Sequence, residues 1–242
     1  MLRRSRLVKS HPSLSTIPAP AVLWRVGYAP TPWNWTDWAY ADQGRFTGRW
    51  DSPDGSYRTL YAGTTLRACL VEVLAPFRPS PAVAAGVDAI EEDEADRALH
   101  PTAEAGLISE SWFSRRRVAT ATADGTFCNV LASLSIAALW PSFHDLSRDQ
   151  FHLADFDAST LLMSAPRQLT QQVGRHIYSH TPTLDGIRFL SRHGVDYELW
   201  ALFERSGDGE TSGRLHDLED GPVEAYEDDV DAICELFGLH RD

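Results

Sequence analysis

Five residues in the first third of the chain have side chains suited to a catalytic site that binds an anion: Arg25, Arg45, Arg49, Tyr61 and Glu72. The arginines can clamp a diphosphate, because a guanidinium forms paired, charge-assisted hydrogen bonds with phosphate oxygens. Glu72 lies beside the apolar stripe of a predicted helix, where a carboxylate is expected to be paired or functional. The alternative is that Arg25 pairs with Glu72 inside the core. Chemistry alone favours neither interpretation.

Several other kinds of site are not predicted. The chain has no GxGxxG or GxxxxGK[ST] phosphate-binding loop and no GxSxG nucleophile motif. His176 and His180 have a spacing that can hold a metal ion on a helix, but the Glu of an HExxH motif is missing, so no metal is expected. Cys69, Cys128 and Cys234 are too far apart for a zinc site or a disulfide framework, and we expect buried thiols.

Charge is distributed unevenly along the chain. The 242 residues include 22 basic and 34 acidic side chains, a net charge of −12. Residues 1–80 carry ten basic and five acidic residues, a net of +5, whereas residues 206–242 carry two against twelve, a net of −10. The basic residues 1–80 can bind a small phosphate compound, and the acidic residues 206–242 are interpreted as a solvated extension. No direct contact with nucleic acid is expected.

No segment predicts an association with a membrane. No apolar stretch approaches the roughly 18 residues of a membrane span. The N-terminus is basic but lacks the apolar core of a secretory signal. We therefore expect a cytoplasmic protein.

The elements that must position these residues follow from the apolar pattern. Residues 1–20 are basic and then Pro/Ser-rich, which predicts a flexible arm. A helix over 66–74 should begin at Thr64 or Thr65, whose oxygen can cap it, and end at Pro76. The pattern further predicts strands over 21–27, 57–62 and 115–123, a buried strand and helix within 127–140, a helix over 169–180, strands over 185–192 and 199–204, a flexible link over 206–213 and a small helix over 230–239.

An aromatic loop follows the first predicted strand. Residues 28–42 contain three tryptophans, two tyrosines and two prolines, without a helix or strand period. Trp33, Trp35 and Trp38 can stack on adenine or nicotinamide, but their spacing fits internal packing equally well.

The chain resembles the RES domain family, which is named for its Arg, Glu and Ser. The resemblance rests on the strings LWRVG, GRFTGRWDSP, LYAGTTLRACLVEVL, RQLTQQVGRHIY and DGIRFLSRHGVDYELWALFE. These strings follow one another in the family's order and span Leu23 to Glu204, about three quarters of the chain.

The resemblance implies an α/β (α+β) fold similar to that of the ADP-ribosyltransferase toxins, a mixed sheet flanked by helices, within a catalytic domain over 21–205. It implies NAD+ as substrate, cleaved at the nicotinamide–ribose bond by hydrolysis or by phosphorolysis with inorganic phosphate, and no further cofactor. Many members are toxins silenced by an antitoxin of the Xre helix-turn-helix class, which implies such a partner.

The resemblance also assigns roles to individual residues. Its main positions fall on Arg25, Arg49, Tyr61, Glu72 and Ser191, and its secondary positions on Arg45, Thr170 and Gln171.

By this resemblance, Glu72 should stabilise the positive charge that develops on the ribose. Arg25 and Arg49 should hold the diphosphate or orient an attacking phosphate. Tyr61 should stack on nicotinamide or donate a hydrogen bond, and Ser191 should bond a ribose or phosphate oxygen. Asp51 replaces a common Asn, which would place an additional carboxylate near the phosphate site.

Two other functions are compatible with the same fold. The protein could transfer ADP-ribose to a macromolecule, or it could be an inactive RES fold that acts as an interaction module through its acidic segment.

Overall fold

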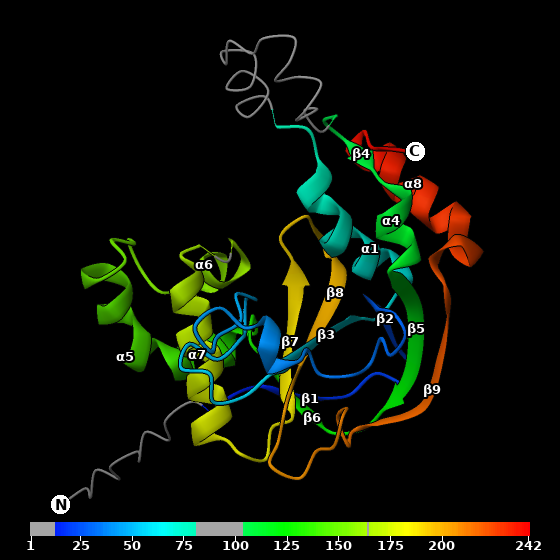
Figure 1. Ribbon diagram of the computed structural model, residues 1–242. Helices are drawn as coiled ribbons and strands as arrows, with labels where there is room; N and C mark the ends of the chain where they lie inside the picture. Colours follow the sequence, from blue (N-terminus) through cyan, green and yellow to red (C-terminus); the bar gives the residue numbers. More distant parts are fainter. Residues whose placement is uncertain (1–12, 81–103, 164) are drawn as a thin grey trace, which may run out of the picture.

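A mixed β-sheet forms the centre of the computed structural model, which describes residues 13–80, 104–163 and 165–242 (Figure 1). Its eight strands lie in the order β1-β6-β7-β8-β3-β2-β5-β9; β6 and β7 are parallel, and the other neighbours are antiparallel. The strands of this sheet are β1 (Thr16–Pro18), β2 (Leu23–Tyr28), β3 (Thr59–Gly63), β5 (Arg116–Ala123), β6 (Thr126–Asn129), β7 (Gly186–Ser191), β8 (Gly194–Phe203) and β9 (Leu215–Pro222). A separate parallel pair joins β4 (Leu107–Ile108) and β10 (His240–Arg241).

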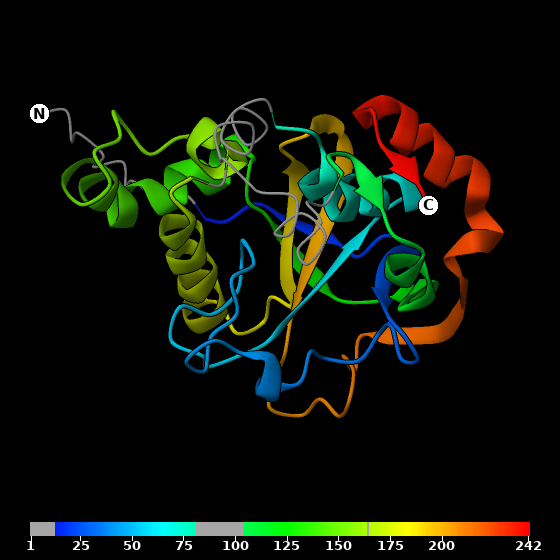
Figure 2. The ribbon, with the colours of Figure 1, turned by 45° about the horizontal axis from the view of Figure 1, so that its top comes forward.

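Helices flank the sheet in two groups, which Figures 1 and 2 show at opposite sides of the molecule. One group contains α5 (Ser133–Asp149), α6 (Ala158–Met163) and α7 (Arg167–His180), and the other contains α1 (Leu66–Leu74), α4 (Glu110–Ser114) and α8 (Glu227–Phe237). The mixed sheet flanked by helices, which the resemblance implied, is confirmed. None of the helices in the described ranges has the length and apolar character needed to cross a bilayer.

Helix α1 has the boundaries that its sequence predicts. The Thr65 side chain accepts a hydrogen bond from the Ala68 N–H at 3.2 Å, which satisfies one of the unpaired donors of the first turn. Leu66, Leu70 and Leu74 are buried on one face. The helix ends at Leu74, and a 3₁₀ turn over Ala75–Phe77 follows it.

Two apolar clusters fix these helices to the sheet. Leu169, Val173 and Ile177 of α7 are fully buried in the larger cluster. Leu70 of α1 and Ile233 of α8 belong to the second cluster. Burial of each large apolar side chain contributes about 1.5–3 kcal/mol. The second cluster therefore holds α1 against the sheet and α8 against α1.

The two ends of the chain differ from the sequence-based expectation. The predicted arm is structured near its end, where Thr16–Pro18 form β1 and pair with β6; residues 1–12 lie outside the described residues. Residues 206–242 are not a solvated appendage, because β9 pairs with β5 and α8 packs on α1. The predicted connection between β7 and β8 is also shorter than expected, since β8 begins at Gly194.

Candidate functional site

A cavity of about 300 Å³ opens where β2, β3 and α1 meet the start of α7. Four of the predicted site residues line it: Arg25, Arg49, Tyr61 and Glu72. They come from three structural elements and one loop, which the sheet order brings together. Of the five candidates that the sequence places in the first third of the chain, all but Arg45 therefore line the same cavity.

Glu72 lies in the last turn of α1 and is half-buried. Its Oε1 accepts a hydrogen bond from the hydroxyl of Ser191 at 2.5 Å. Ser191 is fully buried at the end of β7, and its oxygen also accepts the backbone N–H of His193 at 3.0 Å. Burial lowers the pKa of His193, so its ring is mainly neutral at neutral pH. Ser191 does not line the cavity, and its contact with Glu72 fixes the direction of the carboxylate.

Arg25 does not pair with Glu72. From β2, its Nε donates to the Pro32 carbonyl at 2.7 Å and its Nη1 donates to the Tyr61 carbonyl at 2.6 Å. Burial lowers the pKa of Arg25 to about 10, a value at which the guanidinium stays charged at neutral pH. Its Nη2 makes no hydrogen bond to any described residue, and this nitrogen can serve an anion in the cavity.

Arg49 is almost fully buried, and most of its donors are occupied by the chain itself. Nη1 donates to the Leu190 carbonyl at 3.0 Å, and Nη2 donates to the carbonyls of Leu161 and Leu162. The guanidinium lies 5.0 Å from the centroid of the Phe189 ring, and its Nε has no partner among the described residues. Burial lowers the pKa of Arg49 to about 10. The side chain therefore ties α6 to the end of β7.

A buried network fixes Tyr61. Its hydroxyl accepts the Trp50 N–H at 2.8 Å and donates to Asp51 Oδ1 at 2.8 Å, while the Gly48 N–H donates to the other carboxylate oxygen. Burial raises the pKa of Asp51, and burial and Asp51 keep the pKa of Tyr61 well above its ordinary value. Asp51 does not line the cavity, so its carboxylate supports Tyr61.

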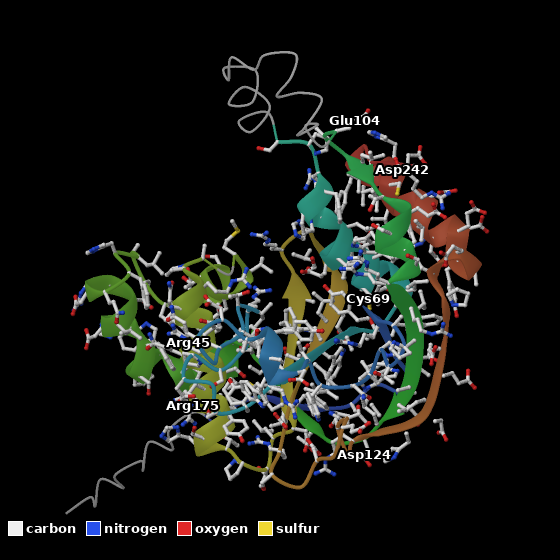
Figure 3. The ribbon with its side chains drawn as sticks, in the orientation of Figure 1. Arg45, Cys69, Glu104, Asp124, Arg175 and Asp242 are labelled. Atoms are coloured by element: carbon white, nitrogen blue, oxygen red, sulfur yellow. The ribbon has the colours of Figure 1, made fainter. Side chains whose placement is uncertain are left out.

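The secondary candidates lie outside the cavity. Arg45 is exposed, and Figure 3 places it on the α7 side of the molecule, away from Cys69 on α1. Thr170 is buried and donates to a carbonyl of its own helix. Gln171 donates to the Gly48 carbonyl at 3.1 Å and so fastens the loop before Arg49 to α7. These three residues have structural contacts here and none with the cavity.

Three residues of the cavity wall whose side chains bear on its chemistry were not predicted from the sequence. Arg167 opens α7 and adds a third guanidinium to the wall, and Phe189 contributes its ring from β7. Arg167 is the first letter of the RQLTQQVGRHIY block, in which only later residues were assigned a role. Cys69 also lines the cavity, and burial raises its pKa to about 12, so it is not a thiolate at neutral pH.

The arrangement combines one oriented carboxylate with three guanidinium groups in a partly apolar cavity. A carboxylate at this position can stabilise a developing cation, and the arginines can bind an anion, because burial strengthens both interactions. No group of three or more His, Cys, Asp or Glu suited to a metal ion occurs among the described residues.

Comparison with known proteins gives the following findings. A protein-family model described as RES domain matches residues 22–222, a range that ends with the last residue of β9. No curated protein matches the chain significantly. Among solved structures, the chain is similar to one in the MbcT-MbcA toxin-antitoxin complex of M. tuberculosis: the two are 15% identical with a TM-score of 0.45, over 89% of this chain and 92% of that chain.

Proposed function

The chain belongs to the RES domain family, and from that membership we propose that it is an enzyme that cleaves the nicotinamide–ribose bond of NAD+. The observation that carries the proposal is the carboxylate of Glu72, held by Ser191 at the wall of a cavity that also contains arginines. This combination suits a substrate that carries a diphosphate and develops positive charge at a ribose.

Glu72 stabilises the transition state. When the nicotinamide–ribose bond breaks, nicotinamide leaves with the bonding electrons, and positive charge develops on the ribose ring. A carboxylate next to this ring lowers the energy of the charged state, and a site shielded from water strengthens the effect. Water or inorganic phosphate then attacks the same carbon of the ribose, which yields ADP-ribose or its phosphate ester.

Arg25 and Arg167 bind the diphosphate. Arg25 lines the cavity, and its Nη2 has no hydrogen-bond partner in the described ranges. Arg167 lines the cavity from the first turn of α7. Each charge-assisted hydrogen bond contributes about 1.5–3 kcal/mol. Arg49 has a positioning role, since its donors hold the Leu190 carbonyl and therefore the strand end that carries Ser191.

Tyr61 forms the floor under the nicotinamide. Its ring lines the cavity, and its hydroxyl is fixed by Trp50 and Asp51, so it is kept in one orientation. The Tyr61 and Phe189 rings are perpendicular to each other, with centroids 6.5 Å apart. An ordered aromatic surface of this kind favours a planar, positively charged ring such as nicotinamide before cleavage.

The activity is tested with purified protein and NAD+ labelled in its ADP-ribose part, with and without inorganic phosphate. Free labelled ADP-ribose indicates hydrolysis, and the labelled phosphate ester indicates phosphorolysis. Label on a macromolecule added to the reaction indicates ADP-ribosyl transfer instead. Intact NAD+ under every condition, together with equal NAD+ affinity of wild type and Glu72→Gln, would overturn the enzymatic proposal and favour an interaction module.

We further propose that the protein is the toxin of a toxin–antitoxin pair whose antitoxin is an Xre-type helix-turn-helix protein. The support is the family resemblance, since many RES proteins act in this way. Induced expression in a bacterial host should arrest growth and lower cellular NAD+, whereas Glu72→Gln should permit growth. Normal growth with the wild-type protein present and folded would contradict the proposal.

A further inference from the structure

A second cavity lies directly beside the first. It has a volume of about 690 Å³ and is bounded by the aromatic loop after β2 and by the residues that precede β5. Arg25 lines both cavities. Its Nε is bonded to Pro32 of the aromatic loop and its Nη1 to Tyr61 of the first cavity, so its guanidinium lies where the two meet.

The wall of the second cavity is rich in aromatic rings. Tyr28, Trp35, Tyr40 and Phe46 line it. Tyr40 is 81% exposed and Tyr28 is 64% exposed, and the Arg116 guanidinium lies over the Tyr28 ring, 4.7 Å from its centroid. The Tyr40 ring is therefore the more open of the two to a ligand. Aromatic rings gathered around one cavity form a candidate ligand-binding surface, because ligand cavities are lined mainly by apolar and aromatic side chains.

Polar groups among these rings have the donors and acceptors that a purine needs. The Asn34 side-chain amide lines the cavity and can donate as well as accept a hydrogen bond. Asn34 and Asp37 line the same cavity and offer oxygens to an exocyclic amino group.

The aromatic loop is held in place by the segment that the sequence predicted to be a flexible link. The backbone N–H of Trp35 donates to the Glu210 carbonyl at 2.9 Å, and the Thr211 hydroxyl donates to the Trp33 carbonyl at 2.5 Å. Asp37 caps the 3₁₀ turn Trp38–Tyr40 by accepting the Ala39 N–H. The site is therefore largely pre-formed, which lowers the entropic cost of binding.

We propose that the second cavity binds the adenine ring of the dinucleotide whose nicotinamide end occupies the first cavity, with Arg25 at the diphosphate between them. This inference rests on the proposed function. The first cavity is at the lower limit of ligand-sized cavities, about 300–1,000 Å³, and is small for a whole dinucleotide. A single-stranded nucleic acid is a poorer occupant, because a basic groove should accompany the rings, and the loop itself carries only Asp37 and Asp42 as charges.

The test separates the two halves of the substrate. AMP carries the adenine, and nicotinamide mononucleotide carries the bond that is cleaved. Calorimetry measures the Kd of each half for wild type and for Tyr40→Ala, and steady-state kinetics measures the KM for NAD+. Tyr40→Phe keeps the ring, and Trp140→Ala removes a partly exposed ring of α5 that lines neither cavity.

The expected result is that AMP binds the wild-type protein and that Tyr40→Ala weakens AMP and raises the KM for NAD+ by roughly tenfold each, as loss of one base–ring stack would. The variant should affect nicotinamide mononucleotide far less. Tyr40→Phe, which keeps the stacking ring, should weaken AMP less than Tyr40→Ala does, and Trp140→Ala should match wild type. No binding of AMP, or equal AMP affinity of wild type and Tyr40→Ala, would overturn the adenine site. Failure of the wild-type protein to cleave NAD+ would instead overturn the proposed function. The AMP measurements would still show whether the second cavity binds adenine.

Discussion

Replacement of Ser191 by Ala should lower kcat and leave KM nearly unchanged. The substitution removes the hydroxyl that donates to Glu72 at 2.5 Å and accepts the His193 N–H at 3.0 Å. Since Ser191 is fully buried and does not line the cavity, the substrate does not lose a direct contact. What is lost is the fixed direction of the carboxylate.

The size of the effect follows from the type of bond. A hydrogen bond to a charged group contributes about 1.5–3 kcal/mol. If the oriented carboxylate acts only in the transition state, its loss corresponds to a decrease in kcat of roughly 10- to 150-fold. The Tm should also fall slightly, because the backbone N–H of His193 loses its acceptor.

The matched control is Ser147→Ala. Ser147 is also fully buried, but its hydroxyl has no hydrogen-bond partner in the described part of the chain. Its replacement should leave kcat unchanged and keep or raise the Tm. The assay is nicotinamide release over a range of NAD+ concentrations. A rise in KM at constant kcat for Ser191→Ala would refute the reasoning and place the hydroxyl on the substrate, as the family resemblance implied.

Three further predictions concern stability and reactivity. Gly48→Ala should lower the free energy of unfolding by about 1–3 kcal/mol, and with it the Tm and the activity, because the added Cβ would overlap the Asp51 carboxylate. Wild-type values in thermal and kinetic assays would contradict this. Hydrogen bonds from Arg58 lower the pKa of Glu204 below its ordinary value of 4.5. The pair therefore stabilises the fold fully at pH values above 4.5, and this stabilisation is lost as the pH falls through the lowered pKa. Glu204→Gln should thus reduce the free energy of unfolding by about 1 kcal/mol at neutral pH and by less in acid, and a pH-independent difference in denaturant titrations would disprove this assignment. Burial raises the pKa of Cys69 to about 12, so iodoacetamide should leave it unmodified in the native protein and modify it in urea, with mass spectrometry as the readout; rapid native modification would show an accessible thiolate.

Local patterns account for the elements that the sequence predicted well. Helix α1 has a Thr cap, an apolar stripe and a following proline, and each of these acts within one or two turns. Strands β1 and β9 were missed because they lie at the two edges of the sheet and carry little apolar periodicity. Their pairing depends on partners far away in the sequence, which no local window contains.

The same limit applies to the site. Residue types in order along the chain were enough to select Arg25, Tyr61 and Glu72, which share the cavity. The contact between Glu72 and Ser191 joins residues 119 positions apart, and it exists only because the fold places the end of α1 near the end of β7. The carbonyl partners of Arg49 also come from distant elements, so its structural contacts could not be inferred from its position beside a glycine.

The central claim is that the Glu72 carboxylate promotes cleavage of the nicotinamide–ribose bond. Its most direct test is the rate of nicotinamide release from NAD+ by wild type, by Glu72→Gln and by Glu224→Gln, in which an exposed glutamate outside the cavity is changed. Wild type and Glu224→Gln should release nicotinamide at the same rate, and Glu72→Gln should be slower by about 100-fold or more while still binding NAD+. Equal rates for all three proteins, or no release by any of them, would contradict the account.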